Sequence, residues 1–286
     1  MTSTAATVVL DRGPITPAAV PAWAGFRGTV RGEWIKLLSL RSTWWVLAAT
    51  VVLITGVSLA VAASLDALAA DPATAGGPAT ANGAEAVSGG FQLGMLTLAV
   101  LGALLITGEY TTGMIRSTLA AVPTRVPVLG AKALVLTVVT VVAASVSIAL
   151  AYVATMPLLS KHDLVPALDE ARTWQVFGGT VYFLVAAALF ALGVGTLLRS
   201  SAAAITVALT VLLLLPGVLS FINLDWVQRI VDYLPLPASG AFLGGDGDSL
   251  SSAGSGLSPT TGLLVVAAYA VVPLVAGAVA LRRRDA

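Results

Sequence analysis

The chain has 286 residues, of which 57% are hydrophobic, 10% are charged and none is cysteine, and its formal net charge is +1. Soluble domains carry roughly 25% charged residues, so this chain lacks the polar surface that a soluble protein of its length needs. The lack of cysteine excludes a disulfide framework, a thiol nucleophile and a thiolate metal site. Runs of about twenty apolar residues, each long enough to cross a bilayer as a helix, recur along the sequence. We therefore predict an all-α, polytopic membrane protein.

The first part of the chain, residues 1–26, lacks the continuous apolar stretch of a signal peptide, and we interpret it as a disordered cytoplasmic tail. Residues 27–286 are predicted to form one transmembrane domain. Its six predicted spans lie at about 43–65, 90–107, 128–157, 174–198, 203–222 and 260–281. The third run is longer than a bilayer requires, and Pro157 is predicted to end it.

The stretch before the first span, GTVRGEWIKLLSLR at 28–41, places Val30, Trp34, Leu37 and Leu38 on one helical face. This pattern favours a short interfacial helix that lies in the plane of the membrane. A solvated positive flank is the alternative. The residues assigned to the interfacial helix are Arg31, Glu33, Trp34, Lys36 and Leu37.

The segments expected on the outer side differ in pattern. Residues 71–90 and 244–256 are rich in Gly, Ala and Ser, and we interpret them as a flexible loop and a linker. Residues 223–235 read NLDWVQRIVDYLP, which indicates an amphipathic helix resting on the outer leaflet. Its apolar stripe consists of Val227, Ile230, Val231 and Leu234.

Orientation follows from the basic residues, because cytoplasmic loops retain Lys and Arg. The predicted spans place twelve of the 15 on the side of the two termini, against Lys161, Arg172 and Arg229 on the other. The twelve are Arg12, Arg27, Arg31, Lys36, Arg41, Arg116, Arg125, Lys132, Arg199, Arg282, Arg283 and Arg284. Both termini are therefore predicted to be cytoplasmic, in the cell membrane of a bacterium.

The predicted spans restrict the chemistry. No charged residue lies near the middle of any of them: Glu109 ends the second span, and Lys132 is expected to snorkel from the start of the third. This pattern argues against a proton-coupled carrier, which needs a buried carboxylate. The one histidine, His162, falls in an outer loop, and no P-loop motif occurs. We therefore expect no catalytic, cofactor-binding or metal-binding residues, and no enzyme activity of the chain itself.

Small and hydroxylated residues recur within the spans, and we expect most of them to let helices approach closely. They are Gly94, Thr97, Gly102, Gly193, Gly195, Thr206, Thr210 and Gly277. An alternative interpretation has Gln92 and Thr97 lining a path for an amphipathic, lipid-like or drug-like substrate.

A charged stretch, GEYTTGMIRSTLAAVPTR at 108–125, interrupts the apolar chain between the second and third spans. Helical spacing predicts a short amphipathic helix there, ended by Pro123. It is either an ordinary connector or a docking surface for a cytoplasmic partner, with Glu109 and Arg116 setting its register. The residues of this predicted coupling helix are Glu109, Tyr110, Met114, Ile115, Arg116, Thr118 and Leu119.

Three segments resemble the membrane permease subunits of actinobacterial ABC-2-type transporters. They are EWIKLLSLRSTWW at 33–45, LLITGEYTTGMIRSTLAAVPTR at 104–125 and LVAGAVALRRRDA at 274–286. The GEYTTGMIRSTL stretch is the most specific of them, and the likeness extends from about residue 30 to the end of the chain.

The resemblance implies that two six-span subunits, the same or related chains, pair in the bilayer. It implies that a separate P-loop ATPase subunit docks on each through the coupling helix and drives export, with no nucleic-acid partner. A membrane scaffold that recruits another cytoplasmic protein is the alternative from a different class, and a secondary carrier is a weaker one.

Overall fold

The computed structural model describes residues 22–70, 82–114, 125–222, 224–244 and 256–283. These ranges are almost entirely α-helical and contain no strand. Six helical segments are long and apolar enough to span a membrane, which confirms the predicted fold class. Residues 1–21 of the predicted tail, most of the 244–256 linker and residues 115–124 lie outside the described ranges. The last five residues of the predicted tail, 22–26, are helical rather than disordered, because the first helix begins at Ala22.

The six spans lie where the apolar runs predict them, and most extend a few residues further at one or both ends. The first four are α2 (Arg41–Ala70), α4 (Phe91–Thr112), α6 (Arg125–Leu159) and α7 (Ala171–Leu198). The fifth consists of α8 (Ser201–Leu209), the π-helical turn η2 (Thr210–Leu214) and α9 (Leu215–Ser220), and the sixth is α12 (Pro259–Arg283). Pro157 does not end the third span, because α6 continues through it to Leu159.

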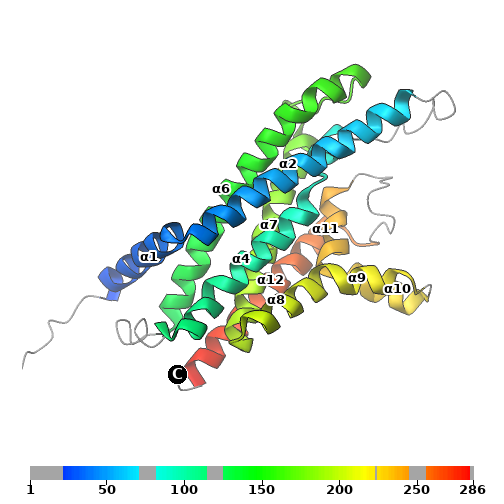
Figure 1. The fold of residues 1–286 in the computed structure, drawn as a ribbon. Helices are drawn as coiled ribbons and strands as arrows, with labels where there is room; N and C mark the ends of the chain where they lie inside the picture. Colours follow the sequence, from blue (N-terminus) through cyan, green and yellow to red (C-terminus); the bar gives the residue numbers. More distant parts are fainter. Residues whose placement is uncertain (1–21, 71–81, 115–124, 223, 245–255, 284–286) are drawn as a thin grey trace, which may run out of the picture.

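The spans form a bundle in which consecutive spans run in opposite directions (Figure 1). The helix α7 lies at its centre, in contact with α4, α6, α8 and α12. At one end of the bundle, which we call the basic pole, lie α1 (Ala22–Ser39), the end of α4, the start of α6, the α7–α8 turn and the end of α12. The opposite pole holds η1 (Ser160–His162), α10 (Asp225–Asp232) and α11 (Pro235–Leu243).

Close contact between the spans depends on glycine, as predicted. A Cβ atom on Gly102 of α4 would lie 2.2 Å from the carbonyl oxygen of Ala188 in α7. One on Gly193 of α7 would lie 2.7 Å from the backbone nitrogen of Leu274 in α12. Dispersion between closely packed backbones holds membrane helices together, because lipid tails solvate apolar side chains equally well.

The fifth span contains a π-helical turn immediately before a proline. The amide of Leu215 donates to the carbonyl of Thr210, five residues earlier, and Pro216 follows. Proline lacks an N–H and its ring clashes with the carbonyl four residues before it. The widened turn accommodates that clash, so the span continues to Ser220 rather than ending.

The structure corrects the interpretation of residues 71–90 as one flexible loop. Residues Gly83–Ser88 form a short buried helix, α3, which contacts α2, α6 and α7. A Cβ on Gly83 would lie 1.7 Å from the carbonyl oxygen of Leu164, so the small residues serve close packing here. Gly and Ala are common both in loops and at tight helix contacts, which is why composition gave the wrong assignment.

The predicted amphipathic helix is α10. Val227, Val231 and Leu234 are buried as the stripe requires, whereas Ile230 is 50% exposed. The buried face is therefore narrower than the sequence predicts.

The Gly102 contact gives a stability prediction. Gly102→Ala should lower the melting temperature of the detergent-solubilised protein, because overpacking typically costs about 1–3 kcal/mol. Gly178→Ala is the matched control, since a Cβ on Gly178 would have no atom within 4 Å. Size-exclusion profiles after heating measure both variants, and equal melting of the two would contradict the close-contact role of Gly102.

Candidate functional site

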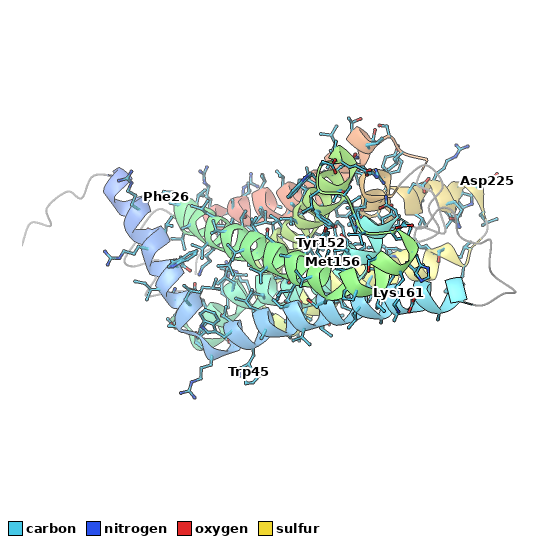
Figure 2. The ribbon with its side chains drawn as sticks, turned by 90° about the horizontal axis from the view of Figure 1, so that it is seen from above. Phe26, Trp45, Tyr152, Met156, Lys161 and Asp225 are labelled. Atoms are coloured by element: carbon cyan, nitrogen blue, oxygen red, sulfur yellow. The ribbon has the colours of Figure 1, made fainter. Side chains whose placement is uncertain are left out.

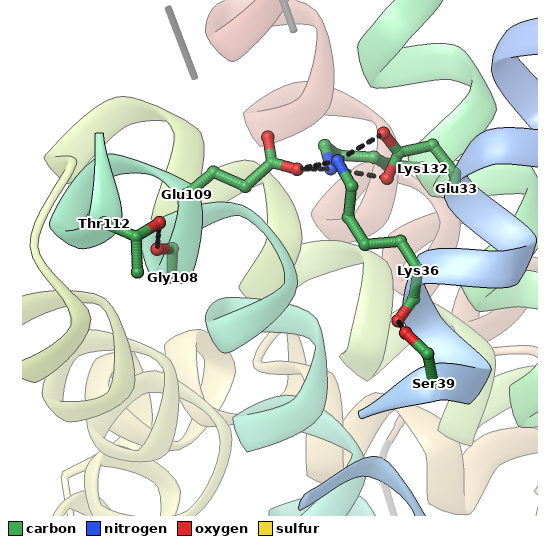
Figure 3. Close-up of polar contacts among 7 residues, drawn as sticks. All are labelled: Glu33, Lys36, Ser39, Gly108, Glu109, Thr112 and Lys132. Atoms are coloured by element: carbon green, nitrogen blue, oxygen red, sulfur yellow. Dashed lines mark hydrogen bonds and ion pairs between the residues drawn. The ribbon is translucent and has the colours of Figure 1, made fainter. Parts of the chain in front are cut away.

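Charged side chains from three helices meet inside the basic pole (Figure 3). Lys132 of α6 is fully buried, with 0% exposure. Its Nζ donates to Glu33 Oε2 of α1 at 2.6 Å and to Glu109 Oε1 of α4 at 2.8 Å. One lysine thus joins three helices that are far apart in the sequence.

A second lysine completes the arrangement. Lys36 Nζ, from α1, donates to Glu33 Oε1 at 3.2 Å and to the same Glu109 oxygen that Lys132 contacts. Its side chain is 28% exposed, so Lys36 lies at the edge of the group. We call Glu33, Lys36, Glu109 and Lys132 the ion-pair cluster. In their ionised forms the two ammonium groups and two carboxylates sum to zero charge.

The cluster is stable only while it is complete. Removing a charge from water costs several kcal/mol, which pairing offsets when hydrogen bonds satisfy both ions. Glu109 uses one oxygen for both lysines, and its Oε2 is buried with no hydrogen-bond partner among the described residues. Glu109 therefore already has few hydrogen-bond donors, and loss of a lysine would leave its buried charge with still fewer.

The charge of Lys36 is secure at neutral pH. Partial burial alone would lower its pKa, but hydrogen bonds and attraction from Glu109 and Glu33 prevail and raise the pKa above its ordinary value of 10.5. Because the folded-state pKa is the higher one, the stabilisation is fully present below about pH 10.5 and is lost only as the pH rises through the raised value. Lys36 therefore stays protonated across the physiological range.

The helical repeat of α1 brings Glu33 into the cluster. Val30, Glu33 and Leu37 occupy one face of α1, and α1 packs against α6. Glu33 is 3% exposed and Leu37 is 1% exposed. The buried Leu37 side chain holds α1 in place, and Glu33 and Lys36 on the same helix supply the carboxylate and the ammonium group.

The end of α4 is also attached on its other side. The guanidinium carbon of Arg199 lies 5.3 Å from the centre of the Tyr110 ring. Arg199 caps α7 with a φ of 55°, in the left-handed region. Ser201 of α8 donates from Oγ to Thr107 Oγ1 at 2.9 Å. The last turns of α4 thus contact α1 and α6 through Glu109, and the α7–α8 turn through Tyr110 and Thr107.

The position of Lys132 contradicts the expectation that it snorkels to the membrane surface. Its ammonium group is buried between two carboxylates instead. Snorkelling is the favourable choice for a lysine facing lipid, but α6 directs this residue toward α1 and α4.

The predicted coupling helix is corrected at its start. Glu109 and Tyr110 belong to α4, which runs to Thr112 and ends at Gly113 with a φ of 71°. Glu109 is 5% exposed and paired within the bundle, so it is not part of an exposed docking surface. Met114 is 46% exposed. Ile115, Arg116, Thr118 and Leu119 lie outside the described residues.

The helix predicted over residues 28–41 is α1 (Ala22–Ser39), but its buried face differs from the apolar stripe. Leu37 is buried as predicted, whereas Trp34 is 36% exposed and Glu33 takes a buried position. Arg31 is exposed and Lys36 is partly buried. The stripe prediction failed because the cluster satisfies the carboxylate inside the protein.

Gln92 and Thr97 do not converge on a path. They are five positions apart on α4, which separates them by about 140° around the helix. Gln92 is exposed, and Thr97 Oγ1 lies 2.7 Å from Thr50 Oγ1 of α2. Thr97 therefore serves the contact between α2 and α4.

Sequence reasoning missed a buried acid at the opposite pole. Glu85 of α3 lies 3.6 Å from Arg172 of α7, which also donates to the carbonyl of Leu243 at 3.0 Å. A signal was present, because Asn82 followed three residues later by Glu85 has the spacing of a helix N-terminal capping box. The side chain of Asn82 accepts from the amide of Ala84 at 2.9 Å.

In the described part of the chain, no three His, Cys, Asp or Glu side chains lie close enough together to hold a metal ion. His162 pairs with Asp66 at the opposite pole, 2.7 Å from Nε2 to Oδ1. Comparison with protein-family models and with curated proteins finds no match.

The cluster predicts that the protein depends on its buried lysine. Lys132→Met should destabilise the protein by about 3–5 kcal/mol, because it leaves buried carboxylates with insufficient compensation. Lys132→Met combined with Glu33→Gln restores the charge balance and should recover much of the loss. Thermal unfolding in detergent measures both variants.

The control is Lys161→Met, which removes a lysine whose pairing with Asp66 is at the surface; its side chain is 54% exposed. It should melt like the unaltered protein. If Lys132→Met also melted like the unaltered protein, the cluster would have no structural role.

Proposed function

We propose that this multi-pass membrane protein is the permease subunit of an ATP-driven exporter. In this proposal a separate P-loop ATPase docks on the segment that follows α4, and a second permease subunit pairs with the chain in the bilayer. The cargo is an amphipathic, lipid-like or drug-like molecule. Six apolar helices are compatible with membrane transport. The resemblance of the GEYTTGMIRSTL stretch to ABC-2-type permeases supports the more specific part of the proposal.

The observation that carries the proposal is the double attachment of α4 at its last turn. Glu109 pairs with Lys132 of α6 and Lys36 of α1, and Tyr110 lies under Arg199 of the α7–α8 turn. A partner that pushes or pulls on the segment after Gly113 would act on α4 first. These contacts would then pass the displacement to both sides of the bundle. A transporter driven by a separate ATPase subunit requires such a transmission of motion.

Partner capture tests the docking site. The tagged full-length chain is purified from mildly solubilised native membranes, and co-eluting proteins are identified by mass spectrometry. We expect a stoichiometric P-loop ATPase, lost in Met114→Asp, because a charge at this exposed apolar position opposes burial in an interface. Leu168→Asp is the matched control, since Leu168 is 51% exposed and lies before α7 at the opposite pole.

Retention of the ATPase in Met114→Asp would remove the docking role of Met114. Elution of the chain alone, or with a partner that lacks a P-loop, would favour the scaffold function over the exporter.

The contact between Tyr110 and Arg199 predicts a variant that binds the ATPase but stimulates ATP hydrolysis less. Tyr110→Leu keeps an apolar side chain but removes the contact with Arg199, whose type is worth about 0.5–2 kcal/mol. We expect the variant to retain the ATPase but to lower permease-stimulated ATP hydrolysis about two- to thirtyfold, as that energy range implies.

Tyr233→Leu, a surface change at the opposite pole, is its control because Tyr233 is 52% exposed. ATP turnover of the complexes in nanodiscs gives the answer. An unchanged rate in Tyr110→Leu would show that the Arg199 contact does not transmit the motion.

A further inference from the structure

The face of α1 that points away from the bundle has a consistent chemical character. Arg27, Arg31, Trp34 and Ile35 share this face, on the side opposite Glu33. All four are exposed, Trp34 at 36% and Ile35 at 56%. Two basic and two bulky apolar side chains thus share a surface that no other described helix covers.

Exposed basic and aromatic side chains also follow the break at Leu40, in the first two turns of α2. Arg41 is exposed there, as are Trp44 at 58% and Trp45 at 77%. Trp44 Nε1 donates to the carbonyl of Leu38 at 2.9 Å, which fixes this ring over the bend between the two helices. Figure 2 shows Trp45 pointing away from the bundle, where α1 leaves the direction of α2. We call Arg27, Arg31, Trp34, Ile35, Arg41, Trp44 and Trp45 the α1 outer face.

The charge of this face is unbalanced. None of its three arginines forms an ion pair with another described residue. The single acid between residues 22 and 45 is Glu33, and the ion-pair cluster holds it inside the protein. The outer face therefore presents three positive charges and no negative one.

We propose that the α1 outer face binds the headgroups of anionic phospholipids. Tryptophan and isoleucine side chains insert at the boundary between headgroups and acyl chains, and arginines contribute about 1 kcal/mol each near an anionic surface. The guanidinium group also forms paired hydrogen bonds with phosphate oxygens. The helix α2, which is long and apolar enough to cross a membrane, begins at Arg41, so the α1 outer face adjoins the start of a candidate span. This inference does not depend on the transport proposal.

Brominated lipids test the proposal, because bromine quenches tryptophan fluorescence at short range. The full-length chain carries Trp23→Phe, Trp174→Phe and Trp226→Phe, which leaves Trp34, Trp44 and Trp45 as its fluorophores. It is reconstituted into nanodiscs of equal phosphatidylglycerol and phosphatidylcholine, with bromine on the chains of one lipid or the other. The ratio of the two quenching efficiencies reports which headgroup surrounds the α1 outer face.

We expect quenching by brominated phosphatidylglycerol to exceed that by brominated phosphatidylcholine at least about twofold at low salt, and the ratio to fall toward one at high salt. Arg27→Gln, Arg31→Gln and Arg41→Gln together should bring the ratio to one. Arg282→Gln with Arg283→Gln, at the same pole on α12, should leave it unchanged.

Three results would overturn the proposal. One is equal quenching by both lipids in the unaltered face, and another is a preference that survives the triple arginine substitution. The third is weak quenching by both lipids together with strong quenching by aqueous acrylamide, which would assign the face to a water-soluble partner.

Discussion

The fully buried ammonium group of Lys132 is the constraint on which the basic pole depends. A lone charge inside a helix bundle is not tolerated, so α1 and the end of α4 must both bring a carboxylate to it. This requirement constrains the rotation of α1, the rotation of the last turns of α4 and the register of α6. The pairing also keeps Glu33 away from the surface, so the charged residues on the other face of α1 are all basic.

Between the two poles, close packing of the helix backbones holds the bundle together. The spans meet where glycine lets one backbone touch another, as at Gly102 against Ala188 and at Gly193 against Pro273 and Leu274. Such contacts have no directionality beyond their fit, and they contribute through many small dispersion terms. Ion pairs and the Arg199–Tyr110 contact add direction at the basic pole, and they converge on the last turns of α4. Under the exporter proposal, these directional contacts thus lie next to the segment on which the ATPase docks.

The six spans could be predicted because each is a long apolar run, and the bilayer allows only helices in such runs. Several glycine contacts and α10 followed from the same kind of local pattern. The cluster could not be predicted, since it depends on which way α1, α4 and α6 face, and a lone lysine near a helix end fits snorkelling equally well. The buried α3 was missed for a related reason: Gly and Ala describe both a loop and a close contact, and only the Asn82–Glu85 spacing distinguished them. The predicted docking residues from Ile115 to Leu119 remain predictions.

The π-helical turn of the fifth span divides that helix into two mechanically different halves. The first half, α8, contacts α4 and α7, whereas α9 beyond Pro216 contacts η2 and α10. Since Pro216 provides no amide hydrogen bond to the turn before it, bending there costs less than in a continuous α-helix. A bend at this turn is therefore the least costly way for the fifth span to match a bilayer of different thickness. We expect the α9 end of the span to change its tilt with membrane thickness, while α8 keeps its contacts with α4 and α7.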